Sequence, residues 1–404
     1  AFRSVCYYTN WAQYRPNEGK YVPENIDPSL CTHIIYAFSK PVELHVEAYE
    51  WNDDDTEYSK GMYSRVIKMK EKNPDLKVLL AIGGWNMASA PFIPLGQTKY
   101  SRETFAKNAV AFLRKRNFDG FDMDWEYPGS VERGSSAADK PKFQLLLEAI
   151  RQEFDDEAEH SGRPRLLLTA AVAAGKINID NAYYVDKLSS TVDFINLMTY
   201  DLHGAWEPFV NIHTPLYPDP KEVGPARYLT VDWAAKYWVS LGAPKEKLNI
   251  GLASYGRSFK LANPDEHTIL SKATGAGTAQ TFTQQEGMMA YFEICNFINE
   301  KGATSVDLPI QIGRYAYKGN LWVGYDDEET IAQKTCYAKQ NGYGGVFFWA
   351  PDLDDFTGQF CNKGNYPLLK ASKNAINSPY TCSKTLSGDI GTDLPPEPWY
   401  NAVL

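Results

Sequence analysis

The sequence of 404 residues lacks several features that define whole classes of protein. No uninterrupted apolar run approaches the ~18 residues of a membrane-spanning helix, so no membrane partner is expected. Basic residues are outnumbered, with 41 Lys and Arg against 50 Asp and Glu and a net charge of −9. Nucleic acids and anionic lipids attract basic surfaces, so we expect neither as a partner. The chain also has no internal repeat and no low-complexity tract.

Several short catalytic and metal-binding motifs are missing as well. The six His form no HExxH, the six Cys form no CxxC, and neither GxSxG nor a phosphate-binding loop occurs. An acidic run that begins at Asp122 fails as an EF-hand, because Tyr127 and Arg133 stand where that loop needs Gly and Glu. A magnesium site on these acids stays open as an alternative, but we expect no metal and no cofactor.

The even number of cysteines favours disulfides in a secreted, extracellular protein over the alternative of free buried thiols. They are Cys6, Cys31, Cys295, Cys336, Cys361 and Cys382. The sequence alone does not fix how they pair. The first residues lead straight into an apolar segment, so we expect a mature form from which a signal peptide is already removed.

Short apolar runs rich in β-branched or aromatic residues alternate with helical stretches. The eight predicted strands are Val5–Thr9, Thr32–Phe38, Lys77–Gly83, Gly120–Glu126, Leu166–Val172, Phe194–Tyr200, Leu248–Ser254 and Gly345–Trp349. Helices are predicted between them, among others at Arg102–Asn117, Lys140–His160, Thr230–Leu241 and Glu328–Asn341. This alternation predicts parallel strands and, with eight units, an α/β fold of the (β/α)8 TIM-barrel type. A doubly wound sheet is the alternative.

Roughly 90 residues separate the seventh and eighth predicted strands, far more than one helix needs. Alternating stretches there predict a small α+β insertion domain between strand 7 and helix 7. The expected division is a catalytic barrel at 1–255 and 325–377, the insertion at 256–324 and a linker-like tail at 378–404. A second long loop, 41–60, carries Trp51 and the acidic run Asp53–Asp55, which we interpret as solvated surface.

The strongest chemical signal is the segment FDGFDMDWEYP at 118–128. Alternate residues of a strand share a face, so Asp122, Asp124 and Glu126 project to one side and the apolar residues between them to the other. Three buried carboxyls repel each other and lose hydration, so stability does not explain them. With 10 Trp, 26 Tyr and 19 Phe in the chain, paired carboxyls at a strand end favour glycoside hydrolysis. Glu126 lies last on the strand and is the expected proton donor.

The spacing D-G-x-D-x-D-x-E from Asp119 to Glu126 resembles the signature of the family 18 glycoside hydrolases, the chitinases. The resemblance covers about residues 3–376 and looks like the animal type. It includes CYYTNWAQYRP at 6–16, LLAIGGWN at 79–86, NLMTYDLHGAW at 196–206, YGRSF at 255–259 and WAPDLDDFTG at 349–358. In one departure, Ala81 replaces the serine of the family's S-x-G-G motif; we expect little effect.

The resemblance implies an endo-acting chitinase with a retaining, substrate-assisted mechanism. Glu126 would protonate the glycosidic oxygen while the substrate's own N-acetyl oxygen attacks the anomeric carbon. Asp124 would hold the acetamido N–H, and Asp122 would exchange a proton with Asp124, so that the carboxyls titrate as a coupled set. Tyr200 would hydrogen-bond the acetamido carbonyl, and Asp201 would hold the twisted sugar.

The resemblance also implies a cleft lined by aromatic side chains. Trp349 would be the floor under the sugar at the cleavage point, unless it is an ordinary core residue. The other expected substrate-binding residues are Trp85, Trp11, Trp206, Trp51, Tyr8, Asn86, Tyr127, Met198, Tyr255, Arg257, Glu286 and Met289. Among these, Tyr8 and Met198 fit barrel packing equally well.

For the cysteines, the pairs Cys6–Cys31 and Cys295–Cys361 follow the animal pattern, and Cys336 and Cys382 remain to pair and hold the tail. The expected partners are chitin and chitooligosaccharides, bound by a monomer. A glycan-binding lectin on the same fold is a rival, although such relatives lack the donor glutamate. An endo-β-N-acetylglucosaminidase acting on N-glycans is another, but the many Trp favour a long linear substrate.

Overall fold

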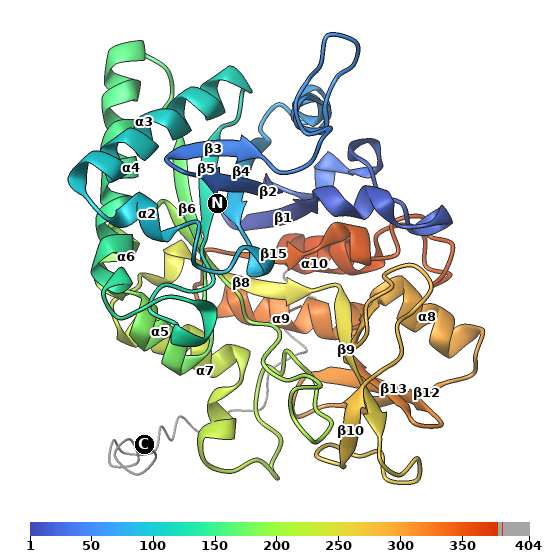
Figure 1. Ribbon diagram of the computed structural model, residues 1–404. Coiled ribbons are helices and arrows are strands. Elements are labelled where there is room, and N and C mark those ends of the chain that lie inside the picture. Colours follow the sequence, from blue (N-terminus) through green and yellow to red (C-terminus); the bar gives the residue numbers. More distant parts are fainter. Residues whose placement is uncertain (379–381, 383–404) are drawn as a thin grey trace.

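Eight parallel strands close into a barrel in this computed structural model, which describes residues 1–378 and Cys382 (Figure 1). The hydrogen-bonded order is β1-β15-β8-β7-β6-β5-β4-β2, and β2 pairs back to β1. The barrel strands are β1 (Arg3–Thr9), β2 (His33–Val42), β4 (Lys77–Gly83), β5 (Gly120–Asp124), β6 (Leu167–Val172), β7 (Phe194–Leu197), β8 (Leu248–Ala253) and β15 (Gly345–Trp349). The predicted TIM barrel is therefore confirmed. The predicted tail, apart from Ser378 and Cys382, lies outside the described residues.

Helices surround the barrel, and several begin where a side chain caps the first turn. Thr98, Thr230 and Asp327 each accept a hydrogen bond from a backbone N–H of the helix that follows. The helices outside the insertion are α1 (Met62–Ile67), α2 (Ile93–Gly96), α3 (Lys99–Lys115), α4 (Asp139–Ser161), α5 (Lys176–Ala182), α6 (Val185–Thr191), α7 (Val231–Ser240), α9 (Glu328–Gln340) and α10 (Pro367–Asn377). One short antiparallel strand, β3 (His45–Ala48), pairs with the end of β2.

The strand β5 separates its two faces as the alternation predicts. Trp125, just after the strand, stacks on Phe92 at 5.2 Å between ring centroids and meets Phe143 of α4 at 5.6 Å. Phe121 contacts Phe105 of α3. This apolar face fastens β5 to the helix layer, so the carboxyl-bearing face must point into the barrel.

The interior of the barrel mixes an apolar cluster with polar side chains. The apolar members are Val5, Tyr7, Ile35, Ala37, Leu79, Ala81, Ala171, Phe194, Met198 and Phe347. Asp122, Thr169, Asn196 and Asn249 are also fully buried there and bond to one another or to Tyr7. Such a core carries polar groups because each has a hydrogen-bond partner.

A second sheet lies between β8 and α9 and occupies the lower right of Figure 1. Its order is β10-β9-β14-β13-β12, with β11 added on β9. The elements are β9 (Tyr255–Leu261), β10 (Ala273–Ala276), β11 (Met288–Ala290), α8 (Tyr291–Asn299), β12 (Thr304–Leu308), β13 (Gly313–Lys318) and β14 (Leu321–Tyr325). The sheet has an apolar cluster of its own, around Phe259 and Trp322. We propose that this α+β segment, predicted as the insertion 256–324, forms a small domain of its own.

Three disulfides tie distant segments together. Cys6–Cys31 joins β1 to the segment before β2, Cys295–Cys361 joins α8 to the segment after β15, and Cys336–Cys382 joins α9 to the chain beyond α10. These are the expected pairs, and within the described part of the chain no cysteine is free.

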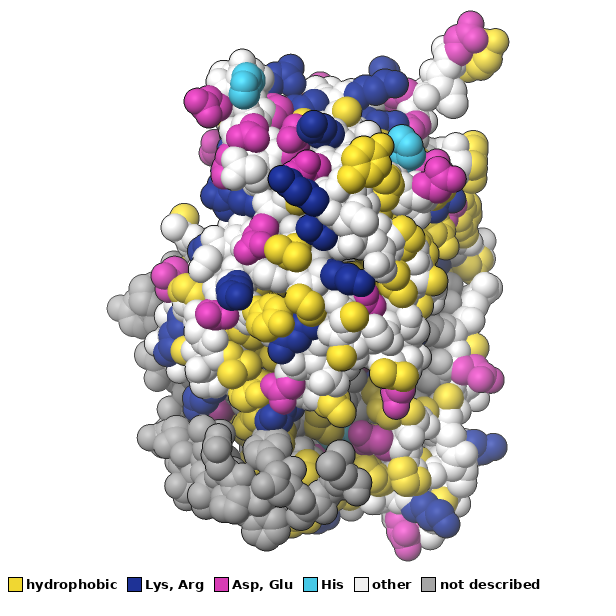
Figure 2. Space-filling view, turned by 60° about the vertical axis from the view of Figure 1, so that its left-hand side comes forward, with side chains coloured by type: hydrophobic (Ala, Val, Ile, Leu, Met, Phe, Trp, Pro, Cys, Tyr) yellow, Lys and Arg dark blue, Asp and Glu magenta, His cyan; other side chains and the backbone are white. Residues whose placement is uncertain are grey.

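The surface carries charges of both signs. Figure 2 shows Lys and Arg side chains interspersed with Asp and Glu, so neither sign dominates this face. Among the described residues, no helix has both the length and the apolar character needed to cross a bilayer.

Candidate active site

Three carboxyl groups meet at the C-terminal end of β5. Asp122, Asp124 and Glu126 are all buried, and the groups of Asp124 and Glu126 lie close enough to share a hydrogen bond. The Oδ1 oxygen of Asp124 is buried, and no N–H or hydroxyl group of the described residues donates to it. A buried acceptor without a donor is costly, so this oxygen is suited to receive an N–H group from a ligand.

Asp122 is fixed from two sides. The hydroxyl of Tyr7 donates to Oδ2 and the hydroxyl of Thr169 donates to Oδ1, both at 2.7 Å. Asn196 donates to the Tyr7 oxygen at 3.0 Å, which leaves the hydroxyl proton of Tyr7 for Asp122. Asn249 in turn donates to Asn196 at 2.9 Å. This chain of bonds across the barrel holds the Asp122 carboxyl in one orientation.

Burial dominates the protonation of all three groups. It raises the pKa of Asp122 to about 6, against the two hydrogen bonds from Thr169 and Tyr7. Burial, followed by the charges of Glu126 and Asp122, raises the pKa of Asp124 well above its ordinary value. Burial also raises the pKa of Glu126 to about 7, with the charge of Asp201 acting in the same direction. In mildly acidic solution Glu126 therefore keeps a proton that it can donate.

Asp201 lies four residues beyond the end of β7 and remains ionised. Burial alone would raise its pKa, but the charge of Arg257, whose Nε donates to Oδ1 at 2.8 Å, and the hydrogen bond from Tyr255 hold the pKa below its ordinary value. The hydroxyl of Tyr255 donates to the same oxygen at 2.7 Å. Asp201 has a left-handed backbone (φ 56°), which a short polar side chain tolerates. Tyr200 beside it contacts the Tyr255 ring.

An aromatic group gathers around Trp349 at the end of β15. Its ring centroid lies 5.3 Å from that of Tyr7 and 5.9 Å from those of Trp11 and Phe38. Trp349 is only half-buried, and Trp11 is partly exposed as well. Trp349 and Trp11 therefore present an open apolar surface, of the kind that stacks on the C–H face of a sugar.

Three further tryptophans are strongly exposed at the same rim. Trp85 is 56%, Trp206 62% and Trp51 81% accessible to solvent. A β-carbon on Gly204 would come within 2.2 Å of the Trp206 ring, so only glycine permits this ring position. Trp51 is steadied by a hydrogen bond from its Nε1 to the Tyr14 hydroxyl at 3.0 Å. Large exposed rings of this kind mark a binding surface rather than a core.

The loop that carries Trp51 is solvated only in part, because the first carboxyl of its acidic run is buried. Asp53 is fully buried and accepts hydrogen bonds from the Tyr36 hydroxyl and from the backbone N–H groups of Tyr49 and Glu50. Asp54 forms an ion pair with Arg116 at 2.6 Å. The interpretation was wrong for Asp53, because the loop folds around a carboxylate that satisfies its amides, whereas Asp54 and Asp55 are partly exposed as expected.

Two predicted cleft residues point elsewhere. Tyr8 faces outward into the barrel–helix layer, where its ring lies 5.1 Å from that of Tyr36, while its neighbour Tyr7 faces inward. Met289 is fully buried, whereas Met288, on the other face of β11, is partly exposed. In both cases a shift of one residue on a strand exchanges the faces, and the sequence did not fix that register.

The remaining predicted residues are distributed as follows. Met198 is buried in the barrel interior, and Tyr127 lies against Glu126. Asn86 and Glu286 are exposed on the segments after β4 and before β11.

Sequence reasoning missed four residues that act on the site. Tyr7 and Thr169 hold Asp122, and His213 accepts a hydrogen bond from the backbone N–H of Asp201 at 3.0 Å. Burial lowers the pKa of His213 to about 4, so it stays neutral. The fourth, Arg133, bonds to the backbone carbonyls of Glu126 and Trp85. Inward alternation along β1 would have identified Tyr7, but the other three depend on contacts between segments that are distant in sequence.

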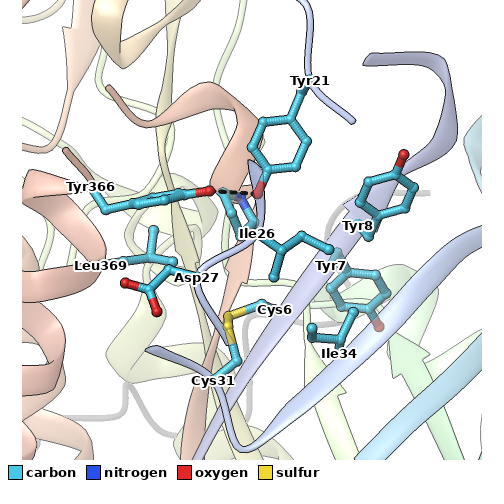
Figure 3. A pocket seen from close by; sticks show the side chains of 11 residues that line it. Cys6, Tyr7, Tyr8, Tyr21, Ile26, Asp27, Cys31, Ile34, Tyr366 and Leu369 are labelled. Atoms are coloured by element: carbon cyan, nitrogen blue, oxygen red, sulfur yellow. Dashed lines mark hydrogen bonds between the residues drawn. A yellow bond between two sulfur atoms is a disulfide. The ribbon is translucent and has the colours of Figure 1, made fainter. Parts of the chain in front are cut away.

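A small cavity beside β1 does not belong to this site. It is lined by Tyr21, Tyr366 and the Cys6–Cys31 disulfide, among others, and measures about 10 Å³ (Figure 3). The hydroxyls of Tyr21 and Tyr366 meet across it at 2.7 Å. This volume is far too small for a sugar. Within residues 1–378 and 382, no cluster of three or more His, Cys, Asp or Glu is arranged to hold a metal ion.

Comparisons with known proteins agree with this geometry. The family described as glycosyl hydrolases family 18 matches residues 3–354. The chain is 50% identical over 367 residues to an endochitinase of Brugia malayi, covering 91% of this chain and 71% of that protein. A solved immunomodulatory active chitinase of Trichuris suis superimposes with a TM-score of 0.88 at 39% identity, covering 93% of this chain and 100% of that one. Human YKL-39, a pseudo-chitinase with retained chitooligosaccharide binding, gives 0.87 at 40% identity, with 94% and 100% covered.

Proposed function

Because this chain belongs to the glycosyl hydrolases of family 18 and is a glycoside hydrolase of the chitinase type, we propose that it cleaves β-1,4-linked N-acetylglucosamine polymers internally, with retention of configuration. The observation that carries the proposal is the buried pair of Asp124 and Glu126. One of the two carboxyls keeps a proton, and the other leaves an oxygen free for a ligand N–H.

In the first step Glu126 transfers its proton to the glycosidic oxygen as the bond from that oxygen to the anomeric carbon breaks. The acetamido carbonyl oxygen of the same sugar forms a new bond to that carbon, which gives a cyclic oxazolinium ion and the free alcohol of the leaving chain. The raised pKa of Glu126 supports this role, because a donor must be protonated when substrate arrives.

Asp124 acts on the acetamido group. Its Oδ1 accepts the acetamido N–H, and once Asp124 has passed its own proton to Asp122 its negative charge stabilises the positive ring that forms. Asp122, fixed by Tyr7 and Thr169, lies next to Asp124 and exchanges a proton with it as the charge on the substrate changes. Tyr200 donates to the acetamido oxygen.

In the second step Glu126, now a carboxylate, removes a proton from water. The water oxygen attacks the anomeric carbon on the face that the leaving chain vacated, and the bond to the acetamido oxygen breaks. Attack on opposite faces in the two steps returns the β configuration. Asp201, ionised beside Arg257, holds the distorted sugar, and Trp349 forms the floor beneath it.

The row of exposed Trp supports long chitin chains and chitooligosaccharides as the substrate class. The three disulfides support an extracellular location, since such bonds persist in oxidising compartments. We further propose that the protein acts as a monomer without a cofactor.

A glycan-binding role without hydrolysis is the second candidate, since one similar structure is a pseudo-chitinase that keeps chitooligosaccharide binding. Replacing Glu126 by Gln distinguishes the two. We expect chitohexaose turnover to fall by about 10³-fold or more while its affinity, measured by calorimetry, stays within about threefold. If the unaltered protein binds chitohexaose but cleaves it no faster than E126Q does, the binding role is correct.

Faster release of N-glycans from a glycoprotein than of dimers from chitohexaose would instead favour an endo-β-N-acetylglucosaminidase.

A further inference from the structure

Arg133 occupies an unusual position between two parts of the rim. It lies at the end of a short 3-10 turn, Val131–Arg133, that follows β5. Its Nε donates to the backbone carbonyl of Glu126 at 3.1 Å, and another guanidinium nitrogen donates to the backbone carbonyl of Trp85. The guanidinium carbon lies 3.6 Å from the centroid of the Trp85 ring. The guanidinium of Arg133 is therefore stacked on the indole and held in place by hydrogen bonds to two separate backbone segments.

The ring of Trp85 has one face left open. A guanidinium in van der Waals contact covers one side of it, yet 56% of the residue remains accessible. That exposure is possible only if the opposite face and edge are free. A sugar that binds to Trp85 must therefore lie on the side away from Arg133.

The positive charge of Arg133 lowers the pKa of nearby Glu126 without forming a salt bridge to that carboxyl. Its hydrogen bonds go to neutral carbonyls, and no ion pair joins it to any acidic side chain in the described part of the chain. Arg257, which lies 5.8 Å from the ring of Trp206, differs in this respect because Asp201 pairs with it at 2.8 Å. The two exposed Trp residues thus have different electrostatic surroundings.

We propose that Arg133 is a specificity-determining residue, which holds Trp85 as a one-faced sugar platform and makes that platform accept neutral N-acetylglucosamine units but reject protonated glucosamine units. The inference rests on the proposed function, because it takes the ligand of Trp85 to be a chitin chain. It adds a distinction between acetylated and deacetylated polymer at a position beside the catalytic carboxyls.

The physical basis is repulsion through a thin ring. A sugar stacked on the open face lies one ring thickness beyond the guanidinium, so its amine comes within roughly 8 Å of the charge. That distance is comparable to the Debye length of about 8 Å at physiological salt, so the repulsion is only partly screened. The ring also gains less from a second cation, because the first already faces its π-electrons. A neutral acetamido sugar meets neither penalty.

The test compares two probes on the inactive E126Q background, so that no probe is cleaved. The probes are the hexamer of N-acetylglucosamine and the fully deacetylated hexamer of glucosamine, titrated by calorimetry at about pH 5, where the amines are charged. R133M removes the charge but keeps an unbranched chain against the ring. R133K keeps the charge and is the conservative control. K187M removes one positive charge from the exposed surface of α6 and controls for net charge.

We expect R133M to bind the glucosamine hexamer about three- to tenfold more tightly than its parent at low salt, with a smaller change for the acetylated hexamer. R133K and K187M should leave the ratio of the two affinities as in the parent. In about 1 M NaCl, where the Debye length is about 3 Å, the effect of R133M should disappear. A purely structural role of Arg133 would not depend on salt in this way.

An unchanged affinity ratio in R133M, or an equal change in R133K, would overturn the inference and leave the proposed function standing. A parent that fails to bind the acetylated hexamer would instead overturn the proposed function, and the inference with it.

Discussion

Single residues determine where the protons lie at the centre of this barrel. Asp122 is saturated by donors from Tyr7 and Thr169, whereas the buried Oδ1 of Asp124 accepts from no N–H or hydroxyl group of the described residues. The same burial that raises all three pKa values thus leaves different groups poised for different tasks. Glu126, with a pKa of about 7, is the one whose proton can leave near neutral pH.

The pKa of Glu126 predicts the alkaline limit of activity. The carboxyl acts as an acid only while protonated, so kcat/KM for chitohexaose should be high below about pH 7 and fall about tenfold per pH unit well above it. A pH–rate profile with buffers of constant ionic strength measures this. A profile that stays flat to pH 9 would contradict the assignment of Glu126 as the donor.

At the scale of elements, the ends of the barrel strands and the loops that follow them supply the site. The loop after β2 turns back as β3 and then folds around buried Asp53 before α1 begins. Asp53 lies under the segment that presents Trp51, and burial raises its pKa to about 6. The position of Trp51 therefore depends on a fully buried carboxyl group.

This dependence predicts that D53N loosens the loop. The amide would turn a donor towards the N–H groups of Tyr49 and Glu50, so we expect a loss of about 1–3 kcal/mol in the free energy of unfolding. Affinity for chitohexaose should fall while turnover of a trimer changes little. D54N, which breaks only a partly exposed ion pair with Arg116, is the control and should cost under about 1 kcal/mol. Equal losses in both variants would refute the special role of Asp53.

The boundaries of the elements show what the sequence could predict. β4 and β15 begin and end where expected, because each is a continuous apolar run bounded by polar or glycine residues. The predicted strand Phe194–Tyr200 stops at Leu197 instead, since the chain turns into the left-handed position of Asp201. β2 is longer than expected because its last residues pair with β3, a hairpin that has no clear alternation.

At the scale of the whole molecule, a disulfide bond links the barrel to the segment that carries the second sheet. The disulfide Cys295–Cys361 connects α8, beside the second sheet, to the segment that follows β15 and Trp349, closing a loop of 66 residues. This arrangement keeps β9, with Tyr255 and Arg257, against Asp201 on the barrel. The stability of the fold and the arrangement of the site are therefore coupled.

Removing the Cys295–Cys361 disulfide should destabilise the protein more than removing Cys6–Cys31, which closes a shorter loop. Chain-entropy arguments give about 4 kcal/mol for a double Ala variant of Cys295 and Cys361, and about 3.5 kcal/mol for Cys6 and Cys31, whose loop is 25 residues. Urea unfolding of both variants measures the difference. A smaller loss for Cys295 and Cys361 than for Cys6 and Cys31 would contradict the proposed link between the two parts.

The three carboxyl groups of the site could be predicted from the sequence, whereas several residues that hold them in place could not. Asp122, Asp124 and Glu126 follow from period-two alternation on one strand. Thr169 could not be found that way, because its contact with Asp122 depends on the register between β5 and β6. The role of Arg133 could not be predicted for a similar reason, since its hydrogen-bond partners lie on the segment after β4 and at the end of β5.

The measurement that tests the account most directly is the anomeric form of the first products released from chitohexaose, followed by NMR in the first minutes. Retention through the acetamido group predicts that the β-anomer of dimers and trimers appears first and then converts slowly to the equilibrium mixture. Initial release of the α-anomer would contradict the roles given to Asp124 and Glu126, because it would require water to attack directly from the opposite face.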